Sequence, residues 1–127
     1  MSNAKELFED SIAVVFLDNG APSRRLARLL LRKYGVSSLL CGRKKRFADA
    51  VDSRFGFIRL DVSADGRLAV ERLIDLADEY SDCILILCAN TDSGSEFVSL
   101  WLDVLESRYV LSPSPEDYLG KFTVLGG

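Results

Sequence analysis

Apolar runs of strand length alternate along this chain with segments whose apolar residues recur at helical spacing. Continuous apolar runs, typical of strands buried on both faces, span Ile12–Leu17 and Cys83–Ala89. Further strands are predicted at Val36–Cys41 and Phe57–Val62, with a short fifth strand at Tyr109–Ser112. This alternation predicts an α/β fold, a Rossmann-like three-layer domain whose mostly parallel sheet has about five strands.

The segments between these strands carry the amphipathic pattern of helices that cover a sheet. The first helix is predicted at Ser23–Tyr34, with Pro22 in its first turn, Ser23 as a possible cap and Gly35 as its C-terminal stop. The remaining helical segments are predicted at 44–55, 65–80, 95–108 and, as a last helical turn, 115–121.

The segment at 95–108 is apolar over more than one face. A helix of this kind needs cover on two sides, and the sheet of a small domain covers only one. We therefore expect Phe97, Trp101 and Leu105 to contact a partner, either another domain or a second copy of the chain. Close packing of Trp101 into the chain's own core is the alternative.

The composition bounds the class of protein. A chain of 127 residues suffices for one domain, and its apolar (48%) and charged (28%) fractions are those of a soluble globular protein. No apolar run approaches the roughly 20 residues of a membrane span, and the N-terminus has no apolar signal-peptide core, so a cytoplasmic location is predicted. The formal charge of −3 gives no general attraction to nucleic acid or to an anionic membrane, and we expect neither as a partner.

The residue types present restrict the possible chemistry. The chain has no histidine, which removes the commonest general base and the commonest zinc ligand, and no metal site is predicted. Cys41, Cys83 and Cys88 each fall in an apolar run without CxxC spacing, which predicts buried, reduced thiols. Catalysis would have to use carboxylates, Lys, Tyr, Ser or Thr.

The loop "DNGAPS" after the first strand is a candidate binding loop, because ligands of parallel α/β sheets bind beyond the carboxyl ends of strands. Its candidate contacts are Asn19, Gly20, Ala21 and Ser23, since the following helix N-terminus can receive an anion. The loop has one glycine of the three in the dinucleotide fingerprint, and Pro22 lacks an N–H donor. A plain strand-to-helix turn therefore remains the alternative.

The loop "ANTDSGSE" after the fourth strand allows two interpretations. Thr91, Asp92 and Ser93 can orient a polar ligand, or the loop can cap the next helix, with Ser93 or Ser95 as the N-cap. The loop Asp61–Asp65 after the third strand lies at the same edge of the sheet. Four consecutive cations at Arg43–Arg46 either hold a phosphate or form a solvated helix start.

Four segments carry a family resemblance: the turn leading to "RRLARLLLRKYG", "SRF" at Ser53–Phe55, "NTDSGSE", and "YVLSPSPEDYLGKF". Together they resemble the N-terminal (pre-ATP-grasp) domain of ATP-grasp carboxylate–amine ligases, the group with D-aspartate ligase and carnosine-synthase-like enzymes. Thr91 and Asp92 match the family's "TSDE" loop, with Ser93 where Glu is usual. Lys121 matches its "DK" step, with Gly120 in place of the Asp.

The resemblance implies that this single domain, residues 1–127, is the non-catalytic front of a larger ligase. It would give structural support and form part of the site for a small carboxylate or amine substrate, through Asn19–Ser23 and Thr91–Ser93. In that family the following ATP-grasp domains bind ATP and Mg²⁺ and form an acyl phosphate that an amine attacks. These domains, or a homo-oligomer partner, would cover the predicted helix at 95–108. This chain alone is expected to bind no cofactor.

Two other functions also fit the sequence. A receiver-like phosphoacceptor domain would hold Mg²⁺ with Asp18, accept a phosphoryl group on Asp61, and use Thr91 and Lys121 beside it. A stand-alone Rossmann-like module would bind a small ligand or a partner without chemistry, and its native polypeptide would end near Gly127.

Overall fold

The computed structural model describes residues 12–44, 55–62 and 65–111. The predicted fold is confirmed: it is a Rossmann-like α/β domain with a five-stranded, all-parallel sheet in the order β3-β2-β1-β4-β5. The strands are β1 (Ile12–Phe16), β2 (Ser37–Gly42), β3 (Gly56–Arg59), β4 (Ile84–Cys88) and β5 (Val110–Leu111). The helices are α2 (Ala21–Tyr34), α4 (Gly66–Glu79), α5 (Asp92–Leu100) and α6 (Leu102–Leu105).

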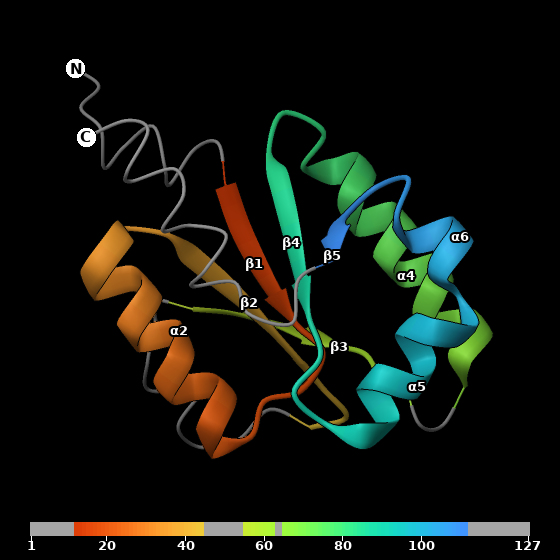
Figure 1. Cartoon of the computed structure of the whole chain (residues 1–127), viewed down its shortest axis with the longest axis horizontal. Coiled ribbons are helices and arrows are strands. Elements are labelled where there is room, and N and C mark those ends of the chain that lie inside the picture. Colours follow the sequence, from red (N-terminus) through yellow and green to blue (C-terminus); the bar gives the residue numbers. More distant parts are fainter. Residues whose placement is uncertain (1–11, 45–54, 63–64, 112–127) are drawn as a thin grey trace.

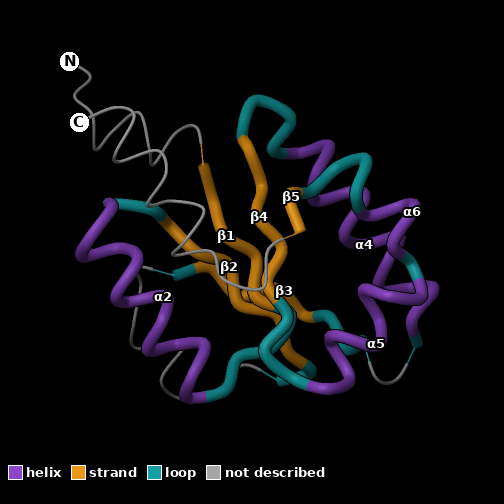
Figure 2. The backbone as a smooth tube through the Cα atoms, in the orientation of Figure 1, coloured by secondary structure: helices purple, strands orange, loops and turns teal. Residues whose placement is uncertain are grey.

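Helices cover both faces of the sheet, with α2 on one face and α4, α5 and α6 on the other (Figures 1 and 2). Strand β1 is central, pairs with β2 and β4, and is buried along its whole length. Because side chains alternate across a strand, Val14 and Phe16 pack with Leu30 of α2, whereas Val15 packs with Leu73 of α4. The continuous apolar run of β1 therefore fills two separate cores.

Helix α2 has a start and a stop that its sequence encodes. Gly20 is the N-cap, in an extended conformation, and Pro22 lies in the first turn, where its missing N–H costs nothing. Gly35 ends the helix in the left-handed region at φ 69°, and its N–H donates to Leu31 O at 2.9 Å. Helix α2 begins at Ala21, so the predicted cap residue Ser23 lies inside the helix.

The predicted helix at 95–108 is instead two helices that meet at Trp101. The backbone of Trp101, at φ −109° and ψ 24°, leaves the helical region and ends α5. Its side chain packs beside the start of α4, where a Cβ on Gly66 would be 3.2 Å from Trp101 Nε1. The break thus turns the indole toward the neighbouring helix.

The observed strand ends differ from the predicted ones by a few residues, most at β3, which ends at Arg59 rather than at residue 62. The predicted helix at 44–55 lies almost wholly outside the described residues, as do the turn at 115–121 and the matches at Gly120 and Lys121. None of the described helices is long and apolar enough to cross a membrane.

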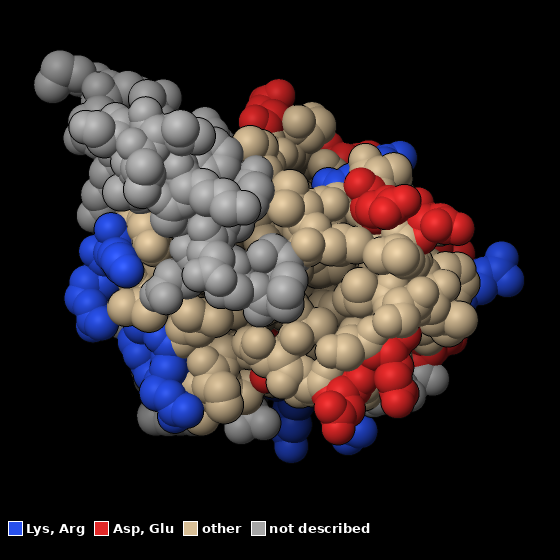
Figure 3. Space-filling model, viewed as in Figure 1, with Lys and Arg blue, Asp and Glu red and all other residues tan. Residues whose placement is uncertain are grey.

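Charge is distributed unevenly over the face shown in Figure 3, where basic side chains gather along α2 and acidic ones lie toward the α4–α6 side. Helix α2 has no acidic residue in its first turn and carries Arg32 and Lys33 in its last turn, where cations complement the helix dipole. On the opposite side, Arg108 forms an ion pair with Asp78 and so connects the segment before β5 to α4.

Candidate functional site

The candidate site lies at the carboxyl ends of β1 and β4. The chain passes from β1 to β2 on one side, while β4 pairs with the other side of β1, so the strand order reverses here. Such a switch point is where open α/β sheets bind ligands. The loop after β1 leads into α2 and the loop after β4 leads into α5, and both helices begin at this end of the sheet (Figure 1).

A hydrogen-bond chain joins these two loops. The Ser23 hydroxyl donates to Asp18 Oδ1 at 2.5 Å and accepts from Asn90 Nδ2 at 2.9 Å. The other carboxylate oxygen of Asp18 accepts from the Gly20 N–H at 2.9 Å. Ser23 is fully buried, so its hydroxyl holds the loops together and is not presented to a ligand.

Asn19 connects the loop after β1 to the end of β2. Its side-chain nitrogen donates to Lys44 O at 3.1 Å, and its backbone carbonyl accepts from the Arg24 guanidinium at 2.6 Å. Only 8% of Asn19 is exposed. Gly42 makes room for it, since a Cβ there would lie 2.6 Å from Asn19 Oδ1. Asn19 therefore fixes the loop from inside, while the neighbouring Ala21 is exposed.

The loop after β4 presents Thr91, Asp92 and Ser93 to solvent. Thr91 is the N-cap of α5, and its Oγ1 accepts from the Gly94 N–H at 3.0 Å, so the predicted cap at Ser93 or Ser95 is wrong. Thr91 takes this place because its backbone is still extended, at φ −122°, whereas Asp92 and Ser93 are already helical. Asp92 lies in the first turn, where the helix dipole favours a carboxylate.

Cys41 and Cys88 are buried free thiols, as predicted. Burial raises the pKa of Cys41 to about 12 and the pKa of Cys88 to about 11, and Asp18 adds to both shifts. Cys88 Sγ lies 3.6 Å from Asn90 Oδ1, which orients the Asn90 amide toward Ser23. Cys83 is only half-buried, which differs from the prediction. At neutral pH the thiol of Cys88, which ends β4, is therefore protonated rather than nucleophilic.

Phe97, Trp101 and Leu105 do not form an outward face. Phe97 (4% exposed) and Leu105 (0%) belong to the domain's own core, and Trp101 is half-buried against it. The Trp101 Nε1 atom is buried without a hydrogen-bond partner. The large apolar side chains that α5 and α6 expose are instead Leu100, Leu102 and Val104. Any partner of these helices would meet those residues.

Two residues of the switch point were missed as binding-site candidates in the sequence. Asp18 and Asn90 lie in the two candidate loops, but neither is predicted from the sequence to contact a substrate, and Asp18 is predicted only as the Mg²⁺ ligand of a receiver-like domain. Each follows an apolar run almost directly, in "FLD" and "CAN". A polar residue at that place in a parallel strand is the signal that could have found both.

Within residues 12–44, 55–62 and 65–111, no group of three or more His, Cys, Asp or Glu side chains is arranged to hold a metal ion. Comparisons of the chain with protein-family models, with curated proteins and with solved structures find no match. What the fold defines is therefore a class, the Rossmann-like α/β domains with a five-stranded parallel sheet.

Proposed function

We propose that this chain is the non-catalytic N-terminal domain of an ATP-dependent carboxylate–amine ligase, and that its switch point forms part of the substrate site. The observation that carries the proposal is the hydrogen bond from Asn90 to Ser23. It holds together two of the four segments that carry the resemblance to pre-ATP-grasp domains. A substrate site at a switch point is built from the two loops that meet there.

The exposed groups at this point suit recognition of an acid or an amine. Helices α2 and α5 both begin here, and the partial positive charge of a helix N-terminus favours a carboxylate. The Asp92 carboxylate is exposed and can pair with an ammonium group. The buried groups, Ser23 and Asn19, keep the loops in place. Binding and positioning are therefore the roles we assign to this domain.

Ligation itself requires groups that we assign to the ATP-grasp domains of the proposed parent enzyme. Those domains bind ATP and Mg²⁺, which supply the phosphoryl group and neutralise its charge. This chain has no histidine that could act as a general base. In the proposed enzyme it supports those domains, with α5 and α6 as the surface we expect them to contact.

The strand order does not favour the receiver-like alternative. That mechanism needs carboxylates after β1 and β3 to act together, and in receivers β1 and β3 are neighbours. Here β2 lies between β1 and β3, and Asp61 is paired with Arg43 at 3.6 Å. The stand-alone binding module remains the second candidate, because it uses the same switch point.

The first test is the size of the native product in its source cells, by antibody detection and intact mass. A product several times larger than the 14.1 kDa of this chain supports the ligase proposal. A product near 14.1 kDa contradicts it and favours the stand-alone module. Phosphorylation of Asp61 by acetyl phosphate with Mg²⁺ would instead indicate a receiver.

The second test is kinetic and uses the full-length protein. We expect amine-dependent release of ADP, with no ATP turnover above background by the 127-residue chain alone. Asp92→Asn should raise the KM for the acid or the amine and leave the KM for ATP unchanged. Asp75→Asn, the same change at an exposed position of α4, is the matched control. Unchanged substrate KM values in Asp92→Asn would place the substrate site elsewhere.

A further inference from the structure

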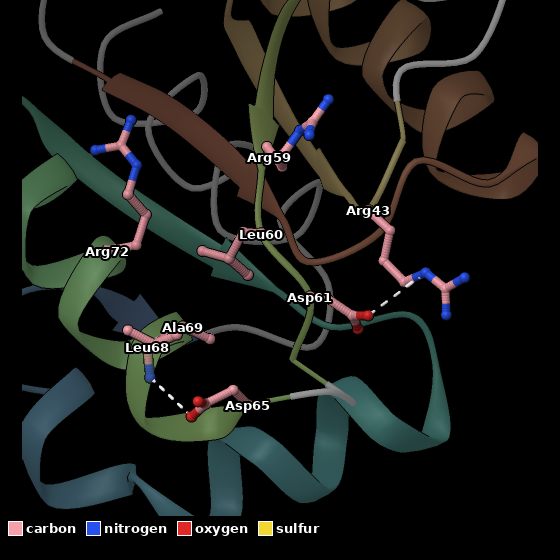
Figure 4. A pocket seen from close by; sticks show the side chains of 8 residues that line it. All are labelled: Arg43, Arg59, Leu60, Asp61, Asp65, Leu68, Ala69 and Arg72. Carbon is pink, nitrogen blue, oxygen red and sulfur yellow. Dashed lines mark hydrogen bonds and ion pairs between the residues drawn. The ribbon is translucent and has the colours of Figure 1, made fainter.

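A second concavity lies apart from the switch point, at the outer edge of the described sheet. This pocket of about 450 Å³ opens between the end of β3 and the beginning of α4 (Figure 4). Strand β2 separates it from β1. Its lining residues are Arg43, Arg59, Leu60, Asp61, Asp65, Leu68, Ala69 and Arg72.

The pocket has an apolar floor. Leu60 and Ala69 are 5% and 3% exposed and belong to the core between the sheet and α4. Leu68, on the same helix, is 62% exposed although it is a large apolar residue. An apolar ligand body resting on these side chains would remove Leu68 from water, which is favourable in proportion to the area covered.

The two carboxylates of the pocket already have partners. Asp61 is paired with Arg43 at 3.6 Å. Asp65 is the N-cap of α4, and its Oδ1 accepts from the backbone N–H groups of Arg67 and Leu68 at 3.1 Å each. Neighbouring protein groups therefore offset the negative charge of Asp61 and Asp65.

Two arginines remain available for a ligand. Arg59 is exposed, and its guanidinium has no hydrogen bond or ion pair with any described residue. Arg72 has only the exposed Glu79 at 3.8 Å, a pair of little strength. Arg59 extends from β3 and Arg72 from α4, on opposite sides of Leu60 (Figure 4). The pocket thus has surplus positive charge in a chain whose net charge is −3.

We propose that this pocket binds a small organic anion, a carboxylate or a phosphate monoester with an apolar body. Its acid group pairs with Arg59 and Arg72, because a guanidinium matches the geometry of these oxyanions. Its apolar body lies on Leu60, Leu68 and Ala69. The volume falls within the range of about 300–1,000 Å³ typical of small-molecule sites. This proposal does not depend on the ligase proposal, since the two sites share no residue.

The test is a nuclear magnetic resonance titration of the ¹⁵N-labelled chain with three probes of similar size: phenyl phosphate, benzoate and benzyl alcohol. We expect saturable shifts of the Leu60, Leu68 and Ala69 amides with at least one anion, and much weaker ones with the neutral alcohol. Tighter binding of phenyl phosphate identifies a phosphate site, and tighter binding of benzoate a carboxylate site. Equal binding of the alcohol, or no saturable shift in the pocket, overturns the proposal.

Arginine variants decide whether the charge is responsible. Arg59→Gln should weaken binding of the anion by about tenfold or more, as expected for loss of a charge-assisted hydrogen bond. Arg25→Gln, an equally exposed change on α2, should leave it unchanged. If the spectrum of Arg59→Gln shows that this variant is not folded, Arg72→Gln is used in its place. Unchanged affinity in a folded Arg59→Gln or Arg72→Gln variant would also overturn the proposal.

Discussion

Asn90, in the loop after β4, donates a hydrogen bond to the hydroxyl of Ser23 in α2, across 67 positions of the sequence. Ser23 in turn donates to Asp18, which follows β1. One buried hydroxyl therefore connects the carboxyl ends of two neighbouring strands. Together with Asn19, this side chain holds the loops of the candidate substrate site in place.

Ser23→Ala should lower the free energy of unfolding by about 1–3 kcal/mol, because it leaves the Asp18 carboxylate and the Asn90 amide without their shared partner. Urea denaturation followed by circular dichroism measures the change. Ser99→Ala, at an exposed position of α5, should stay within about 0.5 kcal/mol of the parent. Equal stability of the two variants would mean that the hydroxyl does not join the loops.

Gly42→Ala should destabilise the fold by about 1–3 kcal/mol, because the new Cβ would lie 2.6 Å from Asn19 Oδ1 and displace a buried side chain. The backbone of Gly42 has no positive φ, so the cost is steric. The double variant Asn19→Ala, Gly42→Ala removes the clash. The loss of unfolding free energy in the double variant should be smaller than the sum of the losses in the two single variants. Losses that simply add, measured by thermal or urea unfolding, would refute the clash.

Thr91→Ala should cost about 0.5–2 kcal/mol, because the Gly94 N–H loses its acceptor at the start of α5. Thr91→Asn should recover most of the loss, since Asn is a good N-cap. The comparison is made by urea denaturation, with Ser95→Ala as a control that leaves the cap intact. A loss in Ser95→Ala as large as in Thr91→Ala would assign the cap to Ser95.

Stability should fall at alkaline pH because of the buried thiols. The pKa values of Cys41 and Cys88 rise from 9.0 to about 12 and about 11 in the folded chain. Well below pH 9, as at pH 7, the thiols are protonated in both states and have no effect. As the pH rises from 9 toward 11–12 they ionise only in the unfolded chain, which favours unfolding.

Urea midpoints measured at pH 7, 9 and 10.5 should therefore decline between the last two. Burial also raises the pKa of Tyr109, whose effect has the same sign, so the variant Cys41→Ala, Cys88→Ala isolates the thiol contribution. This variant is less stable overall, but its midpoint should decline less steeply above pH 9. Parallel declines in the two proteins would contradict the assignment.

Strands β1 and β4 were predictable because their apolar runs are continuous and are followed by clear turn residues. The break at Trp101 was not, because the apolar pattern continues from Phe97 to Leu105 without interruption. At the break, the indole of Trp101 packs beside Gly66, which belongs to another helix, α4. Contacts of this kind leave no local pattern in the sequence.

The candidate site was predictable in its place but not in its division of roles. The switch-point rule indicates the loops after the first, third and fourth strands, and the structure joins the first and the fourth through Asn90 and Ser23. It does not reveal that Ser23 is buried while Thr91, Asp92 and Ser93 are exposed. Arg59 was overlooked because it lies in a predicted strand, and its exposure follows from β3 standing at the edge of the described sheet.

The central place of β1 has a consequence for the folding of the chain during its synthesis. Its partner β2 is complete by Gly42, whereas its other partner, β4, is not complete until Cys88. During that interval the nascent chain carries one unpaired edge of a wholly apolar strand, the kind of surface that aggregates or recruits chaperones. Pairing of β4 with β1 closes that edge and creates the switch point in the same step.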